Sequence, residues 1–447
     1  MQKMTELQYP LDQTDLTFTA SGGSVIRRTV LPSGVRVLTE AVPGVQSASV
    51  SFSVPVGSRD ETNGHFGSTH FLEHLLFKGT TKRTALDIAI AFDSVGGSSN
   101  ASTGKEHTSY YARVQESAVP LAIDVIADML TSSVLDPVEF NNERTVILEE
   151  LAMNEDDPQD VAHEAFFEQV LGDHELGRPI GGTNETITNV TRDAVWEHYR
   201  ANYRPQDLVV VAAGSVDHDN IVKLVEKGLT EAGWNLEELN APRERRSLVS
   251  ASVSRKSALH VVHEENSQAN ILIGMQGIVG NDYRRYAMAV LNTVLGGGMS
   301  SRLFQEIREK RGLAYSTYSF NQGYSDAGVF GLYAGCSPAK AREVSELMIG
   351  ELRKVAESGI TEAELELAYG NVSGGLALKF ESTQARMSRL SGTELSTGEF
   401  VDLDEALRRF RAVTIQDVTE LAAELLKREL SIVAVGDVSE DTFAGLV

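Results

Sequence analysis

Residues 48–57 of the chain read ASVSFSVPVG. Apolar side chains alternate with serines up to Ser53, which is the pattern of a half-buried β-strand that ends at Gly57. A second apolar run, ILIGMQGIVG at residues 271–280, ends on the same Val-Gly pair 223 positions later. The two stretches predict equivalent strands in the two halves of the chain.

Two further landmarks recur at nearly the same offset. Val190-Thr191 precedes the apolar run 208–213, and Val413-Thr414 precedes the apolar run 430–435. Separated matches at one offset indicate an internal duplication. We therefore predict an α+β protein made of two homologous α/β-sandwich domains, each a sheet covered by helices.

The domain limits follow from where the repeats begin and end. A polar, arginine-rich stretch separates the halves. We expect an N-terminal tail (1–25), a first domain (26–235), a linker (236–256) and a second domain (257–447).

The charge of the chain excludes some classes of partner. Lys and Arg total 40 against 63 Asp and Glu, a net charge of −23. Nucleic-acid binding requires a basic surface, so we expect no nucleic-acid partner. We also expect no membrane span, because no run of 18 apolar residues occurs. The first 25 residues resemble neither a secretory signal nor an Arg-rich transit peptide. We expect a cytoplasmic protein, or a mitochondrial-matrix protein whose transit peptide has been removed.

Residues 67–79, GSTHFLEHLLFKG, carry the strongest chemical signal. His70 and His74 are four residues apart and share one helix face, and Glu73 is adjacent on that face. Two imidazoles one turn apart can chelate a divalent ion, and a neighbouring carboxylate can take a proton from a bound water. The alternative is an ordinary helix with unrelated histidines.

A third ligand is expected downstream, because two histidines do not fill a zinc coordination shell. Asp136-Pro137 is a typical helix start, and this helix should run to about Asn154. It carries Glu143 and Glu150 two turns apart on one face, with Glu149 about 100° away. One of these carboxylates could complete the site; alone, they would form an exposed acidic stripe.

The order His-x-x-Glu-His inverts the commoner zincin motif and is the inverzincin signature. With the distal Glu143 and Glu150, the chain resembles the pitrilysin-like M16 metallopeptidases from about Ile26 to Val438. It is most similar to the short bacterial members and to the catalytic beta subunit of mitochondrial processing peptidase. The resemblance implies the metallohydrolase fold of that peptidase.

The resemblance also implies roles for the motif residues. His70, His74 and Glu150 would be the ligands of a Zn²⁺ ion, and Glu73 would be the general base. Glu143 would support the site through His70 or His74. Ligands of this type also accept manganese or cobalt, so the identity of the metal stays open.

The second half lacks the metal motif. The positions 223 residues after His70 and His74 are Thr293 and Gly297. Gly296–Gly298 reads as a flexible loop that opens a helix.

Arg308 and Tyr315 are seven residues apart. The M16 family carries an Arg and a Tyr with this spacing at the same place in the chain. By resemblance they would hold the substrate carbonyl and stabilise the oxyanion. A two-domain chain would supply this pair to a partner's zinc site, which implies a homodimer with two composite sites. The alternative is a helix-surface Arg and a packed Tyr.

Residues 98–110 form a polar run that could be a strand. It resembles the edge strand with which the family pairs the substrate backbone, and Asn100 and Ala101 are the candidate substrate-binding residues. The alternative is an ordinary exposed edge.

The expected function is that of a zinc metalloendopeptidase that hydrolyses short or unfolded peptides inside a chamber, where an acidic wall would favour basic peptides. Two other functions stay open: a non-catalytic structural subunit, and a peptide-binding chamber with a structural zinc. A heterodimer with a different partner chain is a further alternative to the homodimer.

Overall fold

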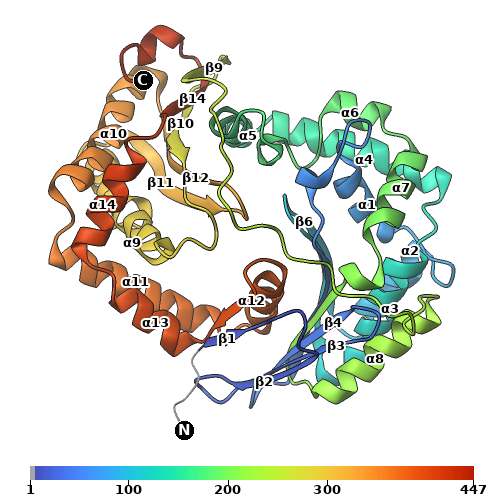
Figure 1. Cartoon of the computed structure of the whole chain (residues 1–447). Helices are drawn as coiled ribbons and strands as arrows, with labels where there is room; N and C mark the ends of the chain where they lie inside the picture. The colour runs from blue at the N-terminus through green and yellow to red at the C-terminus, as the bar shows by residue number, and fades with distance from the viewer. Residues whose placement is uncertain (1–5) are drawn as a thin grey trace. The chain divides into compact units, whose positions relative to one another are not determined.

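A computed structural model describes residues 6–447 of the chain. These residues form two compact units (Figure 1). Unit 1 holds the chain up to Leu151 together with Pro179–Arg246 and Leu376–Ala406. Unit 2 holds Ala152–Arg178, Ser247–Gly375 and Leu407–Val447. Within residues 6–447, no helix has both the length and the apolar character that crossing a bilayer requires.

Unit 1 is built on a seven-stranded sheet with the order β2-β3-β4-β8-β5-β7-β6. Only the β4–β8 pair is parallel among its described pairings. The strands, in chain order, are β2 (Asp15–Thr19), β3 (Val25–Val30), β4 (Arg36–Ala41), β5 (Ser47–Val54), β6 (Ser98–Thr103), β7 (Thr108–Gln115) and β8 (Val209–Gly214). A separate two-stranded sheet pairs β1 (Glu6–Gln8) with β13 (Glu399–Val401).

Helices cover both faces of this sheet. One face packs against α1, α3 and α8, and the other packs against α12 (Thr383–Leu395). The helices that begin in unit 1, apart from α12, are α1 (Ser68–Leu76), α2 (Ala85–Asp93), α3 (Val119–Ser132), α4 (Pro137–Glu155), α6 (Asn184–Asn189), α7 (Arg192–Asn202), α8 (His218–Glu231) and α13 (Leu403–Arg411).

Strand β5 is buried on both faces, not half-buried as its alternating sequence predicts. Its serines Ser49, Ser51 and Ser53 are at most 1% exposed, because α12 covers the face from which they project. Ser49 bonds the hydroxyl of Thr383, and Ser53 accepts from Ser391, both on α12. Polar residues on a strand can therefore mark a hydrogen-bonded helix contact as well as solvent.

Unit 2 repeats this plan with a five-stranded sheet of order β11-β12-β10-β14-β9, in which β14 and β9 are parallel. Its strands are β9 (Leu259–His263), β10 (Ala269–Gln276), β11 (Ala314–Gly323), β12 (Gly328–Cys336) and β14 (Ser431–Gly436). One core contains residues of α9, α10 and α14, and the opposite face packs against α5. The helices are α5 (Pro158–Leu171), α9 (Arg285–Gly296), α10 (Ala341–Ser358), α11 (Glu362–Lys379) and α14 (Ile415–Leu425).

The α+β duplication predicted from the repeat is confirmed, but the units are not continuous in sequence. Helix α5 lies in the first half of the chain yet packs on the sheet of unit 2, and α12 lies in the second half yet packs on that of unit 1. In Figure 1, orange-red α12 lies with the blue strands of unit 1. This division differs from the expected ranges 26–235, 236–256 and 257–447. The expected tail, 1–25, also contributes β2 to the sheet.

A buried histidine in unit 1 links the stability of the fold to pH. His218, the first residue of α8, is 4% exposed and bonds the hydroxyls of Thr29 (3.0 Å) and Thr39 (2.8 Å). Burial, reinforced by the charge of Arg27, lowers the pKa of His218 to about 4. The unfolded chain takes up this proton below about pH 6.5 and the folded chain only near pH 4. Stability is therefore expected to fall by up to about 3 kcal/mol as the pH drops through this window.

The measurement is urea unfolding at pH 7, 5 and 4 for the wild type and H218Q. We expect H218Q to lose less stability on acidification than the wild type. H263Q, which replaces an exposed histidine of β9, should keep the wild-type pH dependence. If H218Q lost as much stability between pH 7 and pH 4 as the wild type does, the loss could not be attributed to His218.

Candidate metal centre

Helix α1 carries the histidine motif and is anchored on one side. Phe71, Leu72, Leu75 and Leu76 are fully buried. The helix begins after Gly67, whose φ of 87° is a left-handed conformation that favours glycine. The histidines therefore lie on the remaining, less buried face.

The start of α1 is held by a buried carboxylate from outside the helix. Glu61 accepts hydrogen bonds from the backbone N–H groups of Gly67 (2.8 Å) and Thr69 (2.7 Å). The first N–H groups of a helix have no partner within the helix, and a negative charge there is favourable. Glu61 thus fixes the end of the helix that presents His70.

Replacing Glu61 by Ala is expected to destabilise unit 1 by about 1–2 kcal/mol, as for other lost helix caps. Zinc affinity should fall as well, because the capped turn includes His70. Asp87, an exposed carboxylate in the first turn of α2 that accepts from the backbone N–H of Thr84, also caps a helix start and is the control. Calorimetry measures the stability of both variants, and zinc titration measures their zinc affinity. D87A should bind zinc as tightly as the wild type. Equal zinc affinities for E61A and D87A would show that Glu61 does not support the metal site.

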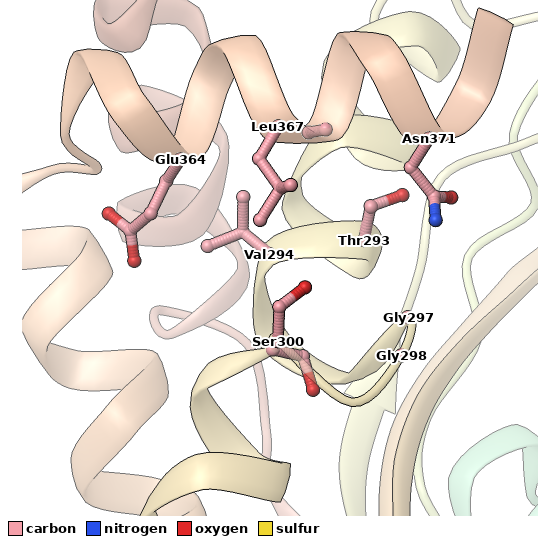
Figure 2. Close-up of a pocket in the computed structure, with 10 residues that line it drawn as sticks. Thr293, Val294, Gly297, Gly298, Ser300, Glu364, Leu367 and Asn371 are labelled. Atoms are coloured by element: carbon pink, nitrogen blue, oxygen red, sulfur yellow. The ribbon is translucent and has the colours of Figure 1, made fainter. Parts of the chain in front are cut away.

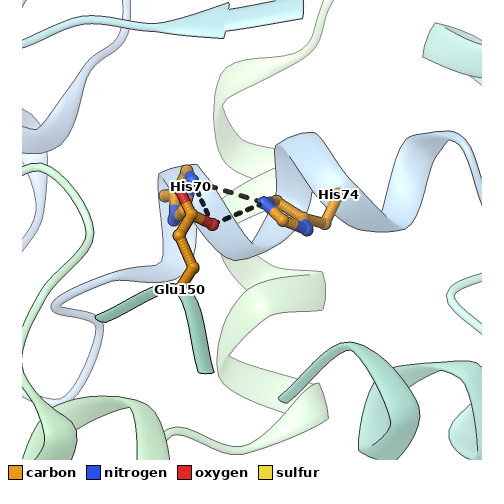
Figure 3. Close-up of side chains that lie close together, drawn as sticks. All are labelled: His70, His74 and Glu150. Atoms are coloured by element: carbon orange, nitrogen blue, oxygen red, sulfur yellow. Dashed lines mark hydrogen bonds and ion pairs between the residues drawn. The ribbon is translucent and has the colours of Figure 1, made fainter. Parts of the chain in front are cut away.

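Three side chains from α1 and α4 converge on one point (Figure 3). The Nε2 atoms of His70 and His74 lie 3.3 Å apart. An Oε2 atom of Glu150 lies 3.8 Å from the His70 nitrogen and 3.6 Å from the His74 nitrogen. These residues form the one group among the described residues whose donor atoms could share a metal ion.

The donor atoms fit a zinc ion. Zinc–nitrogen bonds of about 2.0–2.1 Å at a tetrahedral angle separate two nitrogens by about 3.3 Å. The observed Nε2–Nε2 distance has this value, and the carboxylate oxygen is a few tenths of an ångström farther out. Burial, followed by the charge of His74, lowers the pKa of His70, which favours the neutral ring that a metal requires. Two His and one Glu leave a fourth position open, the pattern of a catalytic zinc site.

The ring of His74 is oriented by Glu143, which contacts the ring nitrogen outside the metal group. Its Nδ1 atom lies 3.0 Å from the Glu143 carboxylate, so this nitrogen carries the proton and Nε2 is free to bind a metal. The other oxygen of Glu143 lies 2.7 Å from the ammonium of Lys78. Glu143 is buried, so it does not belong to an exposed acidic stripe.

Glu73 lies beside the histidines in a different environment. Its Oε2 atom accepts a hydrogen bond from the hydroxyl of Thr103, at the end of β6. Its charge also helps to raise the pKa of the buried phenols of Tyr110 and Tyr203, after the larger effect of their burial. Glu73 is thus hydrogen-bonded by a neutral hydroxyl, whereas Glu143 contacts a cation.

Strand β6 lies at the edge of the sheet, as its resemblance to a substrate-pairing strand requires. Asn100 is exposed on this strand, and Ala101 is buried in the core that also contains the apolar face of α1. Among the other acids of α4, Glu149 is exposed and outside the metal group.

Arg308 and Tyr315 lie in unit 2, so the metal group and this pair belong to different units. Arg308 donates to the carbonyl of Tyr315 at 2.8 Å, and its guanidinium lies 4.5 Å from the centre of the Tyr315 ring. The Tyr315 side chain is 75% exposed. The two residues form a local pair, and the tyrosine is not packed in a core.

The counterpart of the metal site in unit 2 has a threonine and a glycine in place of the two histidines. Thr293 and Gly297 line a small hollow of about 30 Å³ that faces Glu364 of α11 (Figure 2). The guanidinium of Arg302 donates one hydrogen bond to each oxygen of that carboxylate, at 2.7 and 2.9 Å. Gly296 ends α9, and Gly297 and Gly298 lie in the short loop that leads into the next helical segment, residues 302–309, as expected of a loop that opens a helix.

Three residues around the site escaped the sequence analysis: Glu61, Lys78 and Thr103. Lys78 lies four residues after His74, so helix spacing could have placed it on the same face. Glu61 and Thr103 come from a loop and a strand, and their contacts depend on the tertiary fold.

Both halves of the chain match known family models. The family model described as "Insulinase (Peptidase family M16)" matches residues 36–184, and that described as "Peptidase M16 inactive domain" matches residues 189–370. An uncharacterized zinc protease of Streptomyces coelicolor is 46% identical over 94% of this chain and 91% of its own length. An uncharacterized zinc protease of Bacillus subtilis is 37% identical over 91% of this chain and 97% of its own length.

Solved structures show the same fold. A protease from Helicobacter pylori superposes with a TM-score of 0.81 at 24% identity, covering 92% of this chain and 99% of that one. A peptidase M16 inactive domain from Pseudomonas fluorescens gives a TM-score of 0.83 at 17% identity, covering 92% and 98%. The resemblance drawn from the motif is thereby confirmed, and the chain belongs to peptidase family M16.

Proposed function

We propose that this chain is a zinc-dependent endopeptidase that hydrolyses peptide bonds in short or unfolded peptides. The observation that carries the proposal is the convergence of His70, His74 and Glu150 on one point beside Glu73. The names of the relatives, zinc proteases, support it independently.

A zinc ion held by these three residues would polarise the substrate carbonyl and lower the pKa of water. Glu73 takes the proton of the attacking water and passes it to the leaving amine. Glu143 holds His74 with its metal-binding nitrogen free. The two environments support this division of roles, because a carboxylate beside a cation such as Lys78 is a poor base.

The free edge of β6 supports extended peptides as substrates. An extended chain can add to this edge as a further strand through backbone hydrogen bonds, with Asn100 and Ala101 in contact with it. A folded protein offers no such segment. The net charge of −23 favours basic over acidic peptides during encounter.

Arg308 and Tyr315 complete the reaction in this proposal by holding the substrate carbonyl and the oxyanion. They belong to a different unit from the metal group, and the side chain of Tyr315 is exposed, which supports a contribution to the site of a second copy. The active form would then be a homodimer.

Mixing two inactive variants tests this arrangement. E73Q and R308A homodimers are allowed to exchange subunits at equal concentration. In a trans homodimer, each mixed dimer has one intact site, so about a quarter of wild-type activity should return. No recovery after subunit exchange, verified by mass spectrometry, would exclude sites shared between copies.

Hydrolysis of a quenched peptide tests the proposed function itself. Activity should disappear when a chelator removes the metal and return when zinc is added. A structural subunit would show no hydrolysis under any condition, and a peptide-binding protein with a structural zinc would bind the peptide without cleaving it. Either result would overturn the proposal.

A further inference from the structure

The hydroxyl of Thr103 contacts the candidate base directly. Thr103 is the last residue of β6 and pairs with Thr108 of β7. Side chains alternate along a strand, so Thr103 shares the inward face with Ala101, while Ser102 is exposed on the other face. On the inward face lies α1, and the Thr103 hydroxyl donates to Oε2 of Glu73.

This hydrogen bond engages one oxygen of the carboxylate and leaves the second available. Oε1 of Glu73 accepts no hydrogen bond from any described residue, and it is the atom free to meet a water molecule. A glutamate side chain has several rotatable bonds, so an unheld carboxylate would sample many orientations. The β-branched Thr103 on a paired strand is a stiff partner for it.

The chemical type of the partner matters as much as its position. A lysine or arginine at this place would stabilise the charged carboxylate and reduce its basicity. A hydroxyl fixes the oxygen while adding no positive charge. The contrast with Glu143, which contacts both Lys78 and His74, shows that the same site uses both solutions.

We propose that Thr103 is a positioning residue that orients Glu73 for proton transfer, so that one strand both receives the substrate and holds the base. The inference rests on the proposed function, in which Glu73 is the base and β6 pairs with the peptide. It predicts that the hydroxyl of Thr103 contributes to kcat and not to substrate or metal binding.

The test compares T103V with T103S. Valine keeps the shape and branching of threonine but cannot donate, so kcat should fall about 10- to 100-fold, as for the loss of one hydrogen bond to a charged group. KM should stay within about twofold of the wild type. Serine retains the donor and should keep most of kcat. T145V, the same exchange at an exposed position of α4, should leave kcat unchanged.

Two binding measurements separate positioning from structural damage. Zinc affinity should be the same in T103V and the wild type. Peptide affinity, measured in the inactive E73Q background, should not change when T103V is added. If T103V does not fold, T103A supplies the missing-donor variant, with T103S as its folded comparison.

The inference is overturned if T103V retains wild-type kcat, or if T103S loses as much as T103V, since packing would then be the cause. It is also overturned if T103V acts through zinc or peptide affinity. Failure of the proposed function looks different: the wild type itself would then not hydrolyse the peptide, and failure of the base assignment would show as an E73Q that hydrolyses it as well as the wild type.

Discussion

Replacing Glu73 by Gln is expected to lower kcat by about 10²- to 10⁴-fold, the contribution of a positioned general base. Glutamine has nearly the shape of glutamate and can still accept a hydrogen bond from Thr103, so the fold and the strand contact should persist. It cannot take up a proton. The measurement is steady-state hydrolysis of a quenched peptide, with metal content determined on the same sample.

The zinc content of each variant shows whether a loss of activity comes from loss of the metal or from loss of the base. E73Q should bind zinc as tightly as the wild type, because Glu73 is outside the group of donor atoms. E143Q is the informative companion: loss of the carboxylate that orients His74 should weaken zinc binding about 10- to 100-fold, and excess zinc should restore its activity. Added zinc should not restore E73Q. Full hydrolysis by zinc-loaded E73Q would refute its role as the base.

Replacing Glu150 by Ala should weaken zinc binding by more than about 100-fold, beyond the range known for residues that only orient a ligand. Activity should fall in parallel at limiting zinc. The Oε2 atom of Glu150 is the only described carboxylate oxygen that approaches both histidine nitrogens, at 3.8 and 3.6 Å. Zinc titration with a competing chelator measures the effect.

The neighbouring glutamate provides the control for this variant. Glu149 is exposed on the same helix and does not belong to the metal group. E149A removes the same charge one residue away, so it should leave zinc affinity and kcat unchanged. Equal zinc affinities for E150A and E149A would show that α4 supplies no ligand.

The sequence predicts most of this site because helix geometry is local. A four-residue spacing places His70 and His74 on one face wherever the helix lies, and Asp136-Pro137 predicts the start of α4, which the structure has at Pro137. Spacing leaves three acids of α4 as candidates. The fold separates them, because only tertiary packing buries Glu143 and brings Glu150 to the histidines.

The exchange of helices between the halves could not be predicted in the same way. Helices α5 and α12 have the length and caps of ordinary helices, and nothing local indicates which sheet they cover. The serines of β5 illustrate the difficulty, since the same alternation describes a solvent-facing strand and one that hydrogen-bonds to α12. Thr103 is similar: its hydroxyl gains importance only because β6 lies beside α1.

Anomalous X-ray scattering at the zinc edge, from crystals of the purified full-length protein, tests the central claim most directly. The account predicts one strong peak per chain, within about 2.0–2.2 Å of the Nε2 atoms of His70 and His74 and a carboxylate oxygen of Glu150. A peak at another place, or zinc-supplemented crystals without a peak between these three side chains, would contradict it.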